Sequence, residues 1–265
     1  MYASKEVDEV KAIFRSLVGV AALSLVLVGT STAHAASVST ANFGNVTCTG
    51  GVIAPGTYVS LRVTGNCAIT DGLVTVNGGV TVAQNAVLFA ASDTAMVIFR
   101  GNVFVARGGI LVLGCSPDIG CATTTHYRVN GNVESNAALA VILHGNTIRG
   151  RVLISNGGGG LNCDPNPNLQ GAPNYSVIED NVINGNVSVF QLQSCWFGFI
   201  RNVTHGTVTL RNNSFFDPAA MEVVTNTIYG NLACSNNDPA PQVGDSGGNP
   251  NIVFGKKTGQ CANIQ

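Results

Sequence analysis

The chain has 265 residues, of which 45% are hydrophobic, 10% are charged and 32 are glycine, and its formal net charge is −1. A disordered chain would be richer in charge and poorer in apolar residues, so this composition indicates a folded protein. A nucleic-acid-binding protein is also disfavoured, because such proteins gather phosphates with an excess of Lys and Arg.

Residues 1–35 have the pattern of a secretory signal peptide. A basic start is followed by an apolar run from Leu17 to Val28 and by Ala33-His34-Ala35, the small-x-small form that signal peptidase requires. We therefore expect cleavage before Ala36 and a secreted, extracellular mature chain. An uncleaved anchor is the alternative, but the run is much shorter than the ~20 residues of a membrane helix. We expect no membrane span in the mature chain.

One pattern recurs along the rest of the chain, namely apolar-x-Gly-x-apolar-x-apolar. It occurs, for example, in Val76–Val82, Phe99–Val105 and Ile183–Val189. The repeat glycines stand at positions 65, 78, 101, 131, 150, 185, 206 and 230. Two of the longer gaps contain loop-like insertions, at 114–121 and 157–173.

The alternation of apolar residues has a period of two, which predicts short strands with one face buried. A β-sandwich needs hairpin turns and longer strands, and a propeller blade needs about 40 residues. A spacing of roughly 22 residues instead fits one coil of a solenoid. The sequence therefore predicts an all-β protein, a right-handed parallel β-helix with about 8–10 short coils, as a single domain over 36–265.

Gly-Asn pairs mark the expected corners between strands. We expect the glycine to adopt left-handed backbone angles there, and the asparagine side chains to hydrogen-bond from coil to coil. In the second half of the chain, each repeat also begins with an asparagine two residues before its first apolar position: Asn146, Asn181, Asn202 and Asn226.

These Gly-Asn-Val units, together with the ending Gly230-Asn231-Leu232-Ala233-Cys234 and the later Gly259-Gln260-Cys261, carry a resemblance. Over about residues 45 to 261 the chain resembles the pectin-lyase-like class of β-helix proteins, and more closely a group of secreted β-helix proteins without an assigned activity. The resemblance implies an architecture, whereas β-helices host many unrelated functions.

All eight cysteines follow the expected cleavage site, which predicts four disulfides in an exported chain. Neighbours in sequence are neighbours in space in a stack of coils, so we expect sequential pairing. The pairs are Cys48–Cys67, Cys115–Cys121, Cys163–Cys195 and Cys234–Cys261. A zinc site needs a close quartet of ligands, such as two CxxC pairs, and no CxxC motif occurs, so we expect no zinc site. We expect no other metal either.

The ends of a solenoid must be covered, because they expose strand edges and the apolar core. We expect residues 36–58 to form an N-terminal cap. We expect residues 235–265 to form a tail that the Cys234–Cys261 disulfide ties back, with Ile252-Val253-Phe254 as its apolar cover.

Candidate catalytic residues are few. Glycoside hydrolysis needs two carboxyl groups within about 5–10 Å, and Glu179 or Asp180 could meet Asp217 across stacked coils. The alternative is that all three are solvated turn residues. The motifs of polygalacturonases are absent, and the acidic residues are too scattered to predict a calcium site.

A second candidate site follows from the repeat itself, because residues at equal offsets stack above one another. Four residues directly precede a repeat glycine and would form an exposed column: Arg149, Asn184, His205 and Tyr229. Such a column either binds a glycan or is an ordinary solvated face. Trp196 is likewise either a sugar platform or a residue packed over a disulfide.

The sequence thus favours a secreted, non-enzymatic protein with a structural role or a role in binding a surface or an extracellular polysaccharide. The rival hypothesis is a polysaccharide lyase or glycoside hydrolase with a divergent active site. No cofactor and no nucleic-acid partner are expected, and the sequence does not indicate an oligomeric state.

Overall fold

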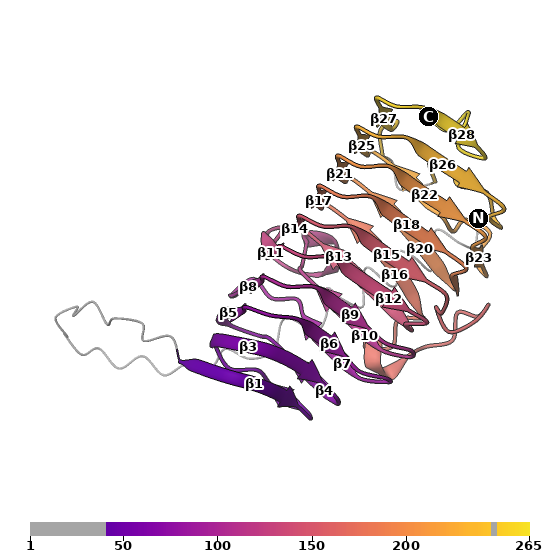
Figure 1. The fold of residues 1–265 in the computed structure, drawn as a ribbon. Helices are drawn as coiled ribbons and strands as arrows, with labels where there is room; N and C mark the ends of the chain where they lie inside the picture. Colours follow the sequence, from indigo (N-terminus) through magenta and orange to yellow (C-terminus); the bar gives the residue numbers. More distant parts are fainter. Residues whose placement is uncertain (1–40, 245–247) are drawn as a thin grey trace, which may run out of the picture.

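The structure, a computed structural model, describes residues 41–244 and 248–265 (Figure 1). The expected signal peptide and the first residues after it lie outside this part. The described chain winds into stacked coils, and every pairing between its strands is parallel. The predicted all-β parallel solenoid is therefore confirmed.

Three faces of stacked strands make up the solenoid. The first face consists of β1 (Asn42–Cys48), β3 (Gly56–Val63), β5 (Gly72–Val76), β8 (Ala95–Phe99), β11 (Tyr127–Val129), β14 (Asn146–Ile148), β17 (Val182–Ile183), β21 (Val203–Thr204), β25 (Thr227–Ile228) and β27 (Ile252–Val253). These ten strands, paired each to the next, agree with the number of coils expected from the repeat.

The strands β1 and β3 continue into the second face. Above them it contains β6 (Val80–Val82), β9 (Val103–Val105), β12 (Val133–Asn136), β15 (Val152–Ser155), β18 (Val187–Phe190), β22 (Val208–Arg211), β26 (Leu232–Ser235) and β28 (Lys257–Gly259). The third face contains β2 (Gly51–Val52), β4 (Asn66–Ala68), β7 (Val87–Ala90), β10 (Ile110–Leu113), β13 (Ala140–His144), β16 (Tyr175–Glu179), β20 (Trp196–Ile200) and β24 (Glu222–Val224). A short pair, β19 (Gln193–Ser194) and β23 (Ser214–Phe215), and two 3-10 turns, η1 (Pro117–Ile119) and η2 (Pro167–Leu169), complete the described elements.

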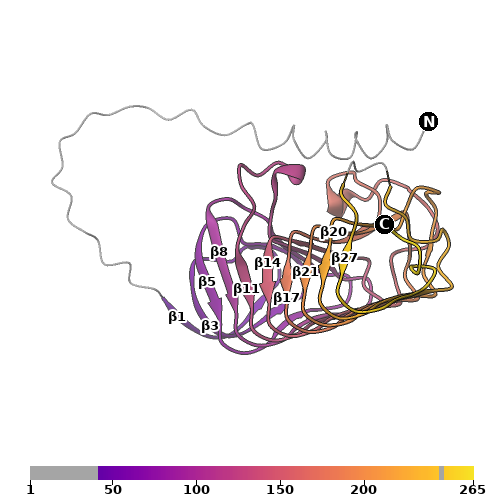
Figure 2. The same ribbon diagram turned by 90° about the horizontal axis from the view of Figure 1, so that it is seen from above.

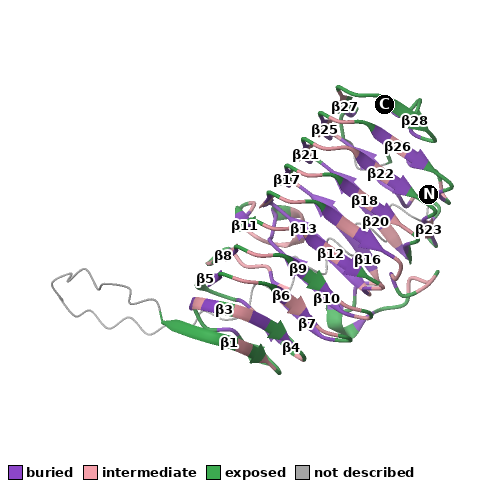
Figure 3. Cartoon of the chain, viewed as in Figure 1, coloured by how far each residue is buried: buried purple, intermediate pink, exposed green. Residues whose placement is uncertain are grey.

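The strands follow the apolar alternation of the sequence. In β9, for example, Val103 and Val105 are fully buried while Phe104 between them is exposed. Valine, isoleucine and leucine from all three faces fill one continuous core along the solenoid axis. Figure 3 shows this arrangement, with buried strands and more exposed corners.

The repeat positions require glycine for a different reason from the one expected. None of them has a positive φ, so left-handed backbone is not what they provide. Instead, each lies directly on the backbone of the coil below: a Cβ on Gly101 would lie 2.3 Å from the carbonyl oxygen of Gly78, and one on Gly150 would lie 2.5 Å from that of Gly131. Only glycine permits coils to approach this closely at the corner.

The left-handed residues lie at the other two corners. After the second face they include Asn85, Ala137, Asn156, Gln191, Asn212 and Asn236, and after the third face Gly145, Asp180, Arg201 and Thr225. The expected asparagine hydrogen bonds at the glycine corner are present, since Asn132 Oδ1 accepts from Arg151 N and Asn231 Oδ1 accepts from Lys256 N.

A buried ladder of five asparagines follows the third face. In each step, the Oδ1 of one asparagine accepts hydrogen bonds from the backbone N and the Nδ2 of the asparagine one coil below, with Nδ2–Oδ1 distances of 2.9–3.1 Å. The members are Asn146, Asn181, Asn202, Asn226 and Asn251. The Oδ1 of Asn146 lacks a donor because Tyr127, not asparagine, pairs with it in the coil below.

The two inserted loops cover the outer side of the third face. Leu169 and Ala172 from one loop, together with Ile119 from the other, pack on outward residues such as Val112 and Ile142. Figure 2 shows both loops, in magenta and salmon, on one side of the stack. Both sides of β10, β13 and β16 are therefore buried.

The four expected disulfides are those found, from Cys48–Cys67 to Cys234–Cys261. Disulfides persist in oxidising environments, so they are typical of a protein located outside the reducing cytosol. Within residues 41–244 and 248–265, no helix has the length and apolarity needed to cross a membrane.

The C-terminal tail closes its end of the solenoid, and of the three apolar residues expected to cover it only Val253 packs against the core. Ile252 and Phe254 are 59% and 66% exposed, whereas Cys261 and Ile264 are buried and belong to the core. The described part of 36–58 does not lie across the other end, because it forms β1, β2 and the start of β3 as ordinary rungs.

The asparagine ladder predicts a position-specific stability effect. Asn202→Ala removes both the donor and the acceptor of one rung, so the buried backbone N of Asn181 loses its acceptor and Ile178 O loses a donor. We expect chemical denaturation to show a loss of about 3 kcal/mol in the free energy of unfolding. The matched control Asn184→Ala, at an exposed position, should change it by less than about 0.5 kcal/mol. Equal effects of the two substitutions would contradict the structural importance of the ladder.

Candidate functional site

Three carboxyl groups converge where the third face turns towards the buried asparagine ladder. Glu179 ends β16, Asp180 is the left-handed corner residue after it, and Asp118 comes from η1 in the first inserted loop. One carboxylate oxygen of each lies within 4.8 Å of the other two. We call Asp118, Glu179 and Asp180 the carboxylate cluster.

Arg201 binds all three members of the carboxylate cluster. It occupies the same left-handed corner one coil above Asp180. Its Nη2 lies 2.5 Å from Glu179 Oε1 and 3.0 Å from Asp180 Oδ2, and it also contacts Asp118, while its Nε donates to Asp180 Oδ1 at 2.8 Å. Hydrogen bonds with Asp180 are the main reason why the pKa of Arg201 is raised.

His144 lies below Glu179 in the register between β13 and β16. Its Nδ1 is 3.4 Å from Glu179 Oε2 and 3.4 Å from Ser116 Oγ. Burial lowers the pKa of His144 to about 4, and burial raises the pKa of Glu179 to about 8 even though Arg201 opposes that rise. At neutral pH the contact between His144 and Glu179 therefore joins two neutral groups and is not an ion pair.

The carboxylate cluster has the ligand types of a calcium site, which needs several charged oxygens. However, the guanidinium of Arg201 contacts every carboxylate, so it occupies the position that a cation would need. The arrangement works instead as a latch, because Asp118 and Arg201, 83 residues apart in sequence, join the first inserted loop to the corner of the third face.

Asp217 lies apart from the carboxylate cluster. Its backbone N donates to Cys195 O, and its Oδ1 accepts from Ala219 N at 2.8 Å in a local turn. This places it beside the residue that precedes β20, whereas Glu179 pairs with Ile200 at the end of β20. Five residues of extended strand, roughly 16 Å, separate the position beside Asp217 from the position beside Glu179. The two expected carboxyl partners therefore do not meet across the coils.

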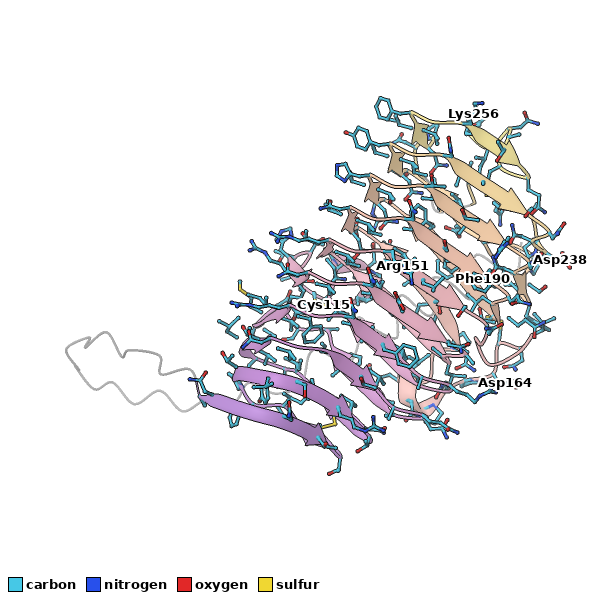
Figure 4. The ribbon with its side chains drawn as sticks, in the orientation of Figure 1. Cys115, Arg151, Asp164, Phe190, Asp238 and Lys256 are labelled. Atoms are coloured by element: carbon cyan, nitrogen blue, oxygen red, sulfur yellow. A yellow bond between two sulfur atoms is a disulfide. The ribbon has the colours of Figure 1, made fainter. Side chains whose placement is uncertain are left out.

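The four residues expected to form an exposed column do so. Arg149, Asn184, His205 and Tyr229 follow their first-face strands and are all exposed. The column also contains residues that the sequence analysis did not assign to it, namely Arg100, Asn130 and Phe254. Figure 4 shows the row of side chains along this edge of the stack. We call these seven residues the corner column.

The upper part of the corner column is an aromatic stack. The rings of His205 and Tyr229 have centroids 5.1 Å apart with 4° between their planes, and those of Tyr229 and Phe254 are 4.9 Å apart at 5°. The spacing matches the rise of one coil, ~4.8 Å. The rings cover each other's faces, so they present their edges and polar atoms to solvent.

Trp196 is not exposed as a sugar platform would be. Its indole lies across Gly198, where a Cβ would approach the ring to 2.3 Å, and it packs against the residue cluster beneath the second inserted loop. Its ring centroid is 6.3 Å from that of Tyr175.

Neither Arg201 nor His144 was assigned to a site from the sequence, and Asp118 was counted only among the scattered acidic residues. Asp118 lies in a loop closed by Cys115–Cys121, and nothing in its neighbourhood in the sequence indicates a partner near residue 201. The sequence does carry a signal for Arg100, Asn130 and Phe254, because each directly precedes a glycine as the four predicted column residues do.

No protein-family model matches this chain, and neither a curated protein nor a solved structure matches it. Its function is therefore argued from its own residues.

The buried pair Glu179 and His144 predicts a dependence of stability on pH. Because the pKa of Glu179 rises from 4.5 to about 8 on folding, its contribution is complete below pH 4.5 and is lost as pH rises towards 8. The pKa of His144 falls from 6.5 to about 4, so its contribution is lost as pH falls from 6.5. Of the two groups only Glu179 titrates between pH 6.5 and 8, and we expect the free energy of unfolding to fall by about 1 kcal/mol per pH unit on average over this range.

The measurement is chemical denaturation at several pH values between 6.5 and 8. Glu179→Gln should remove this slope, and the control Asp217→Asn, at the far end of the strands, should keep it. A slope that persists in Glu179→Gln would show that Glu179 does not titrate in this range.

Proposed function

We propose that this chain is a secreted, non-enzymatic β-solenoid that binds an extracellular polysaccharide along the corner column. The single observation that carries the proposal is the continuous exposed row from Arg100 to Phe254 on consecutive coils. It extends over six coil steps, about 29 Å, which suits an extended polymer better than a compact ligand.

The charges around the corner column favour an acidic polymer. Arg100 and Arg149 belong to the column, and Arg128 projects from β11 beside it. None of the ion pairs of the described residues involves these three arginines, and the first-face strands contain neither Asp nor Glu. Arginine is well suited to carboxylate and sulfate groups because its guanidinium can form two parallel hydrogen bonds.

The aromatic stack adds a second kind of contact. Tyr229 is 50% exposed, and its hydroxyl group, like the ring nitrogens of His205, can hydrogen-bond to sugar hydroxyls. The ring edges also provide rigid apolar surface at a low cost in side-chain entropy, because the stacked rings are already ordered.

The parallel coils and four disulfides support a further proposal about the export of the chain and the class of proteins to which it belongs. We infer that the chain is exported after cleavage before Ala36 and that it belongs with the secreted β-helix proteins of the pectin-lyase-like class. Edman sequencing of the secreted protein tests the cleavage site.

A second candidate function, cleavage of a polysaccharide, is favoured by one observation. Glu179 is a carboxyl group whose pKa is raised to about 8 beside two further carboxylates, which is what a general acid at neutral pH needs. The bonds of Arg201 to all three groups favour the latch instead.

Binding is tested by retention of the protein on insoluble or immobilised acidic and neutral polysaccharides, with and without Ca²⁺. We expect retention on acidic polymers that weakens as salt is added, because exposed charges are screened. Product release that Glu179→Gln abolishes would instead establish the enzyme, while the absence of both retention and release would contradict both functions.

The aromatic stack can be tested separately. The double variant His205→Ala/Tyr229→Ala should weaken binding about tenfold, equivalent to about 1.4 kcal/mol. Phe104→Ala removes an exposed ring from the second face and is the matched control. An equal loss in both variants would show that the corner column is not the binding surface.

The arginines predict a stronger effect. Arg100→Glu/Arg149→Glu places like charges opposite an acidic polymer and should abolish retention. The control Arg62→Glu reverses an exposed charge outside the corner column. Unchanged binding of the double variant would exclude an acidic ligand at this edge.

A further inference from the structure

The two ends of the solenoid differ. At the C-terminal end, the last residues fold over the core, so that Cys261 and Ile264 are buried. The top asparagine of the buried ladder is also capped, because Asn251 donates both its backbone N and its Nδ2 to Gln265 O. This end offers no open rung of the ladder to another chain.

At the N-terminal end, β1 is an edge strand with one partner. In the described part of the chain it pairs with β3 alone, along its whole length from Asn42 to Cys48. Cys48 O accepts from Thr64 N, directly after β3, and since the backbone groups of successive residues in a strand point to opposite sides, those of Thr47 point away from β3. Figure 3 shows how exposed β1 is compared with the strands above it.

The edge of β1 lacks the charged residues and prolines that usually prevent edge-to-edge pairing. Its seven residues, Asn-Phe-Gly-Asn-Val-Thr-Cys, include no charge and no proline. Phe43 is still 36% exposed although it stacks on Tyr58 at 4.8 Å, and Val46 and Cys48 are only partly buried. The core of the solenoid is therefore least covered at this end.

We propose that β1 pairs antiparallel with β1 of a second copy, so that two solenoids join N-terminal end to N-terminal end about a twofold axis. A twofold contact uses the same surface on both copies, so it needs no complementary site at the C-terminal end. The uncharged strand brings no like charges together across the junction. At the C-terminal end β27 and β28 also have one partner strand each, but Lys256 and Lys257 place charge at the edge of β28, and charged edges disfavour pairing. Head-to-tail stacking is therefore disfavoured, and the assembly stops at a dimer.

The second copy fits β1 better than the residues that precede it. A strand from the same chain that covered β1 would need about seven residues and a two-residue turn. The mature chain expected from the cleavage site has only residues 36–40 before Ala41. The junction would bury little surface, so we expect a dissociation constant on the order of micromolar.

The dimer has a consequence for the proposed function, and this part rests on that proposal. The corner column descends through Asn77 and Val59 to Gly44, which lies near the middle of β1. Antiparallel pairing near that point brings the corner columns of the two copies into one line. A polymer could then contact both copies at once, which increases avidity without any new contact type.

The test is sedimentation velocity on the mature secreted protein without polysaccharide, from about 1 to about 100 µM, a range that brackets a micromolar constant. We expect a shift from monomer to dimer. Thr47→Pro removes a backbone donor from the free edge and should leave a monomer at every concentration, while Thr47→Ala keeps that donor and should dimerise like the parent. A monomer throughout for the parent, or oligomers larger than a dimer, would overturn the proposal.

A second measurement covers the case in which Thr47→Pro fails to fold, which its thermal unfolding would reveal. Hydrogen–deuterium exchange of the parent protein should slow at the Thr47 amide as concentration rises, while amides at the C-terminal end stay unchanged. Exchange that does not depend on concentration would overturn the proposal. Because neither measurement contains polysaccharide, failure of dimerisation is distinguishable from failure of binding.

Discussion

Every coil of this solenoid lies directly on the coil below, at the ~4.8 Å spacing of hydrogen-bonded strands. This constraint decides which residues can occupy each corner. At the glycine corner, the backbones approach so closely that a Cβ on Gly206 would lie 2.4 Å from the carbonyl oxygen of Gly185. At the corner after the third face, successive coils are joined by hydrogen bonds between buried asparagine side chains. These asparagines form the ladder from Asn146 to Asn251. The core, the exposed column and the latch all take their positions from this stacking.

The sequence was informative where the stacking repeats in every coil. The spacing of glycines near 78, 101 and 131 predicts the solenoid, because a repeated local requirement leaves a repeated residue. The same regularity predicts the sequential disulfides and the exposed column. The reason given for the glycines was wrong, because close approach between backbones and left-handed angles both select glycine and cannot be separated in one sequence.

The carboxylate cluster could not be predicted in the same way, because it depends on one inserted loop that occurs once. Asp118 reaches Arg201 only after the loop folds over β13 and β16, and such a contact leaves no periodic pattern. Two sites of different character thus share one scaffold. In the carboxylate cluster Arg201 contacts all three carboxyl groups, whereas no ion pair among the described residues involves the arginines of the corner column.

The buried ladder also bears on how such a protein can change over evolutionary time. Each middle asparagine of the ladder accepts hydrogen bonds from the asparagine of the coil below and donates hydrogen bonds to that of the coil above. A middle coil therefore fits equally well between any two others. Duplication or deletion of one whole coil, such as the segment from Asn181 to Arg201, would rejoin matching partners and leave both ends unaltered. A change of a few residues would instead shift the asparagine out of line. Length variation among descendants of this chain should therefore occur in steps of one coil, except in the loops outside the stack.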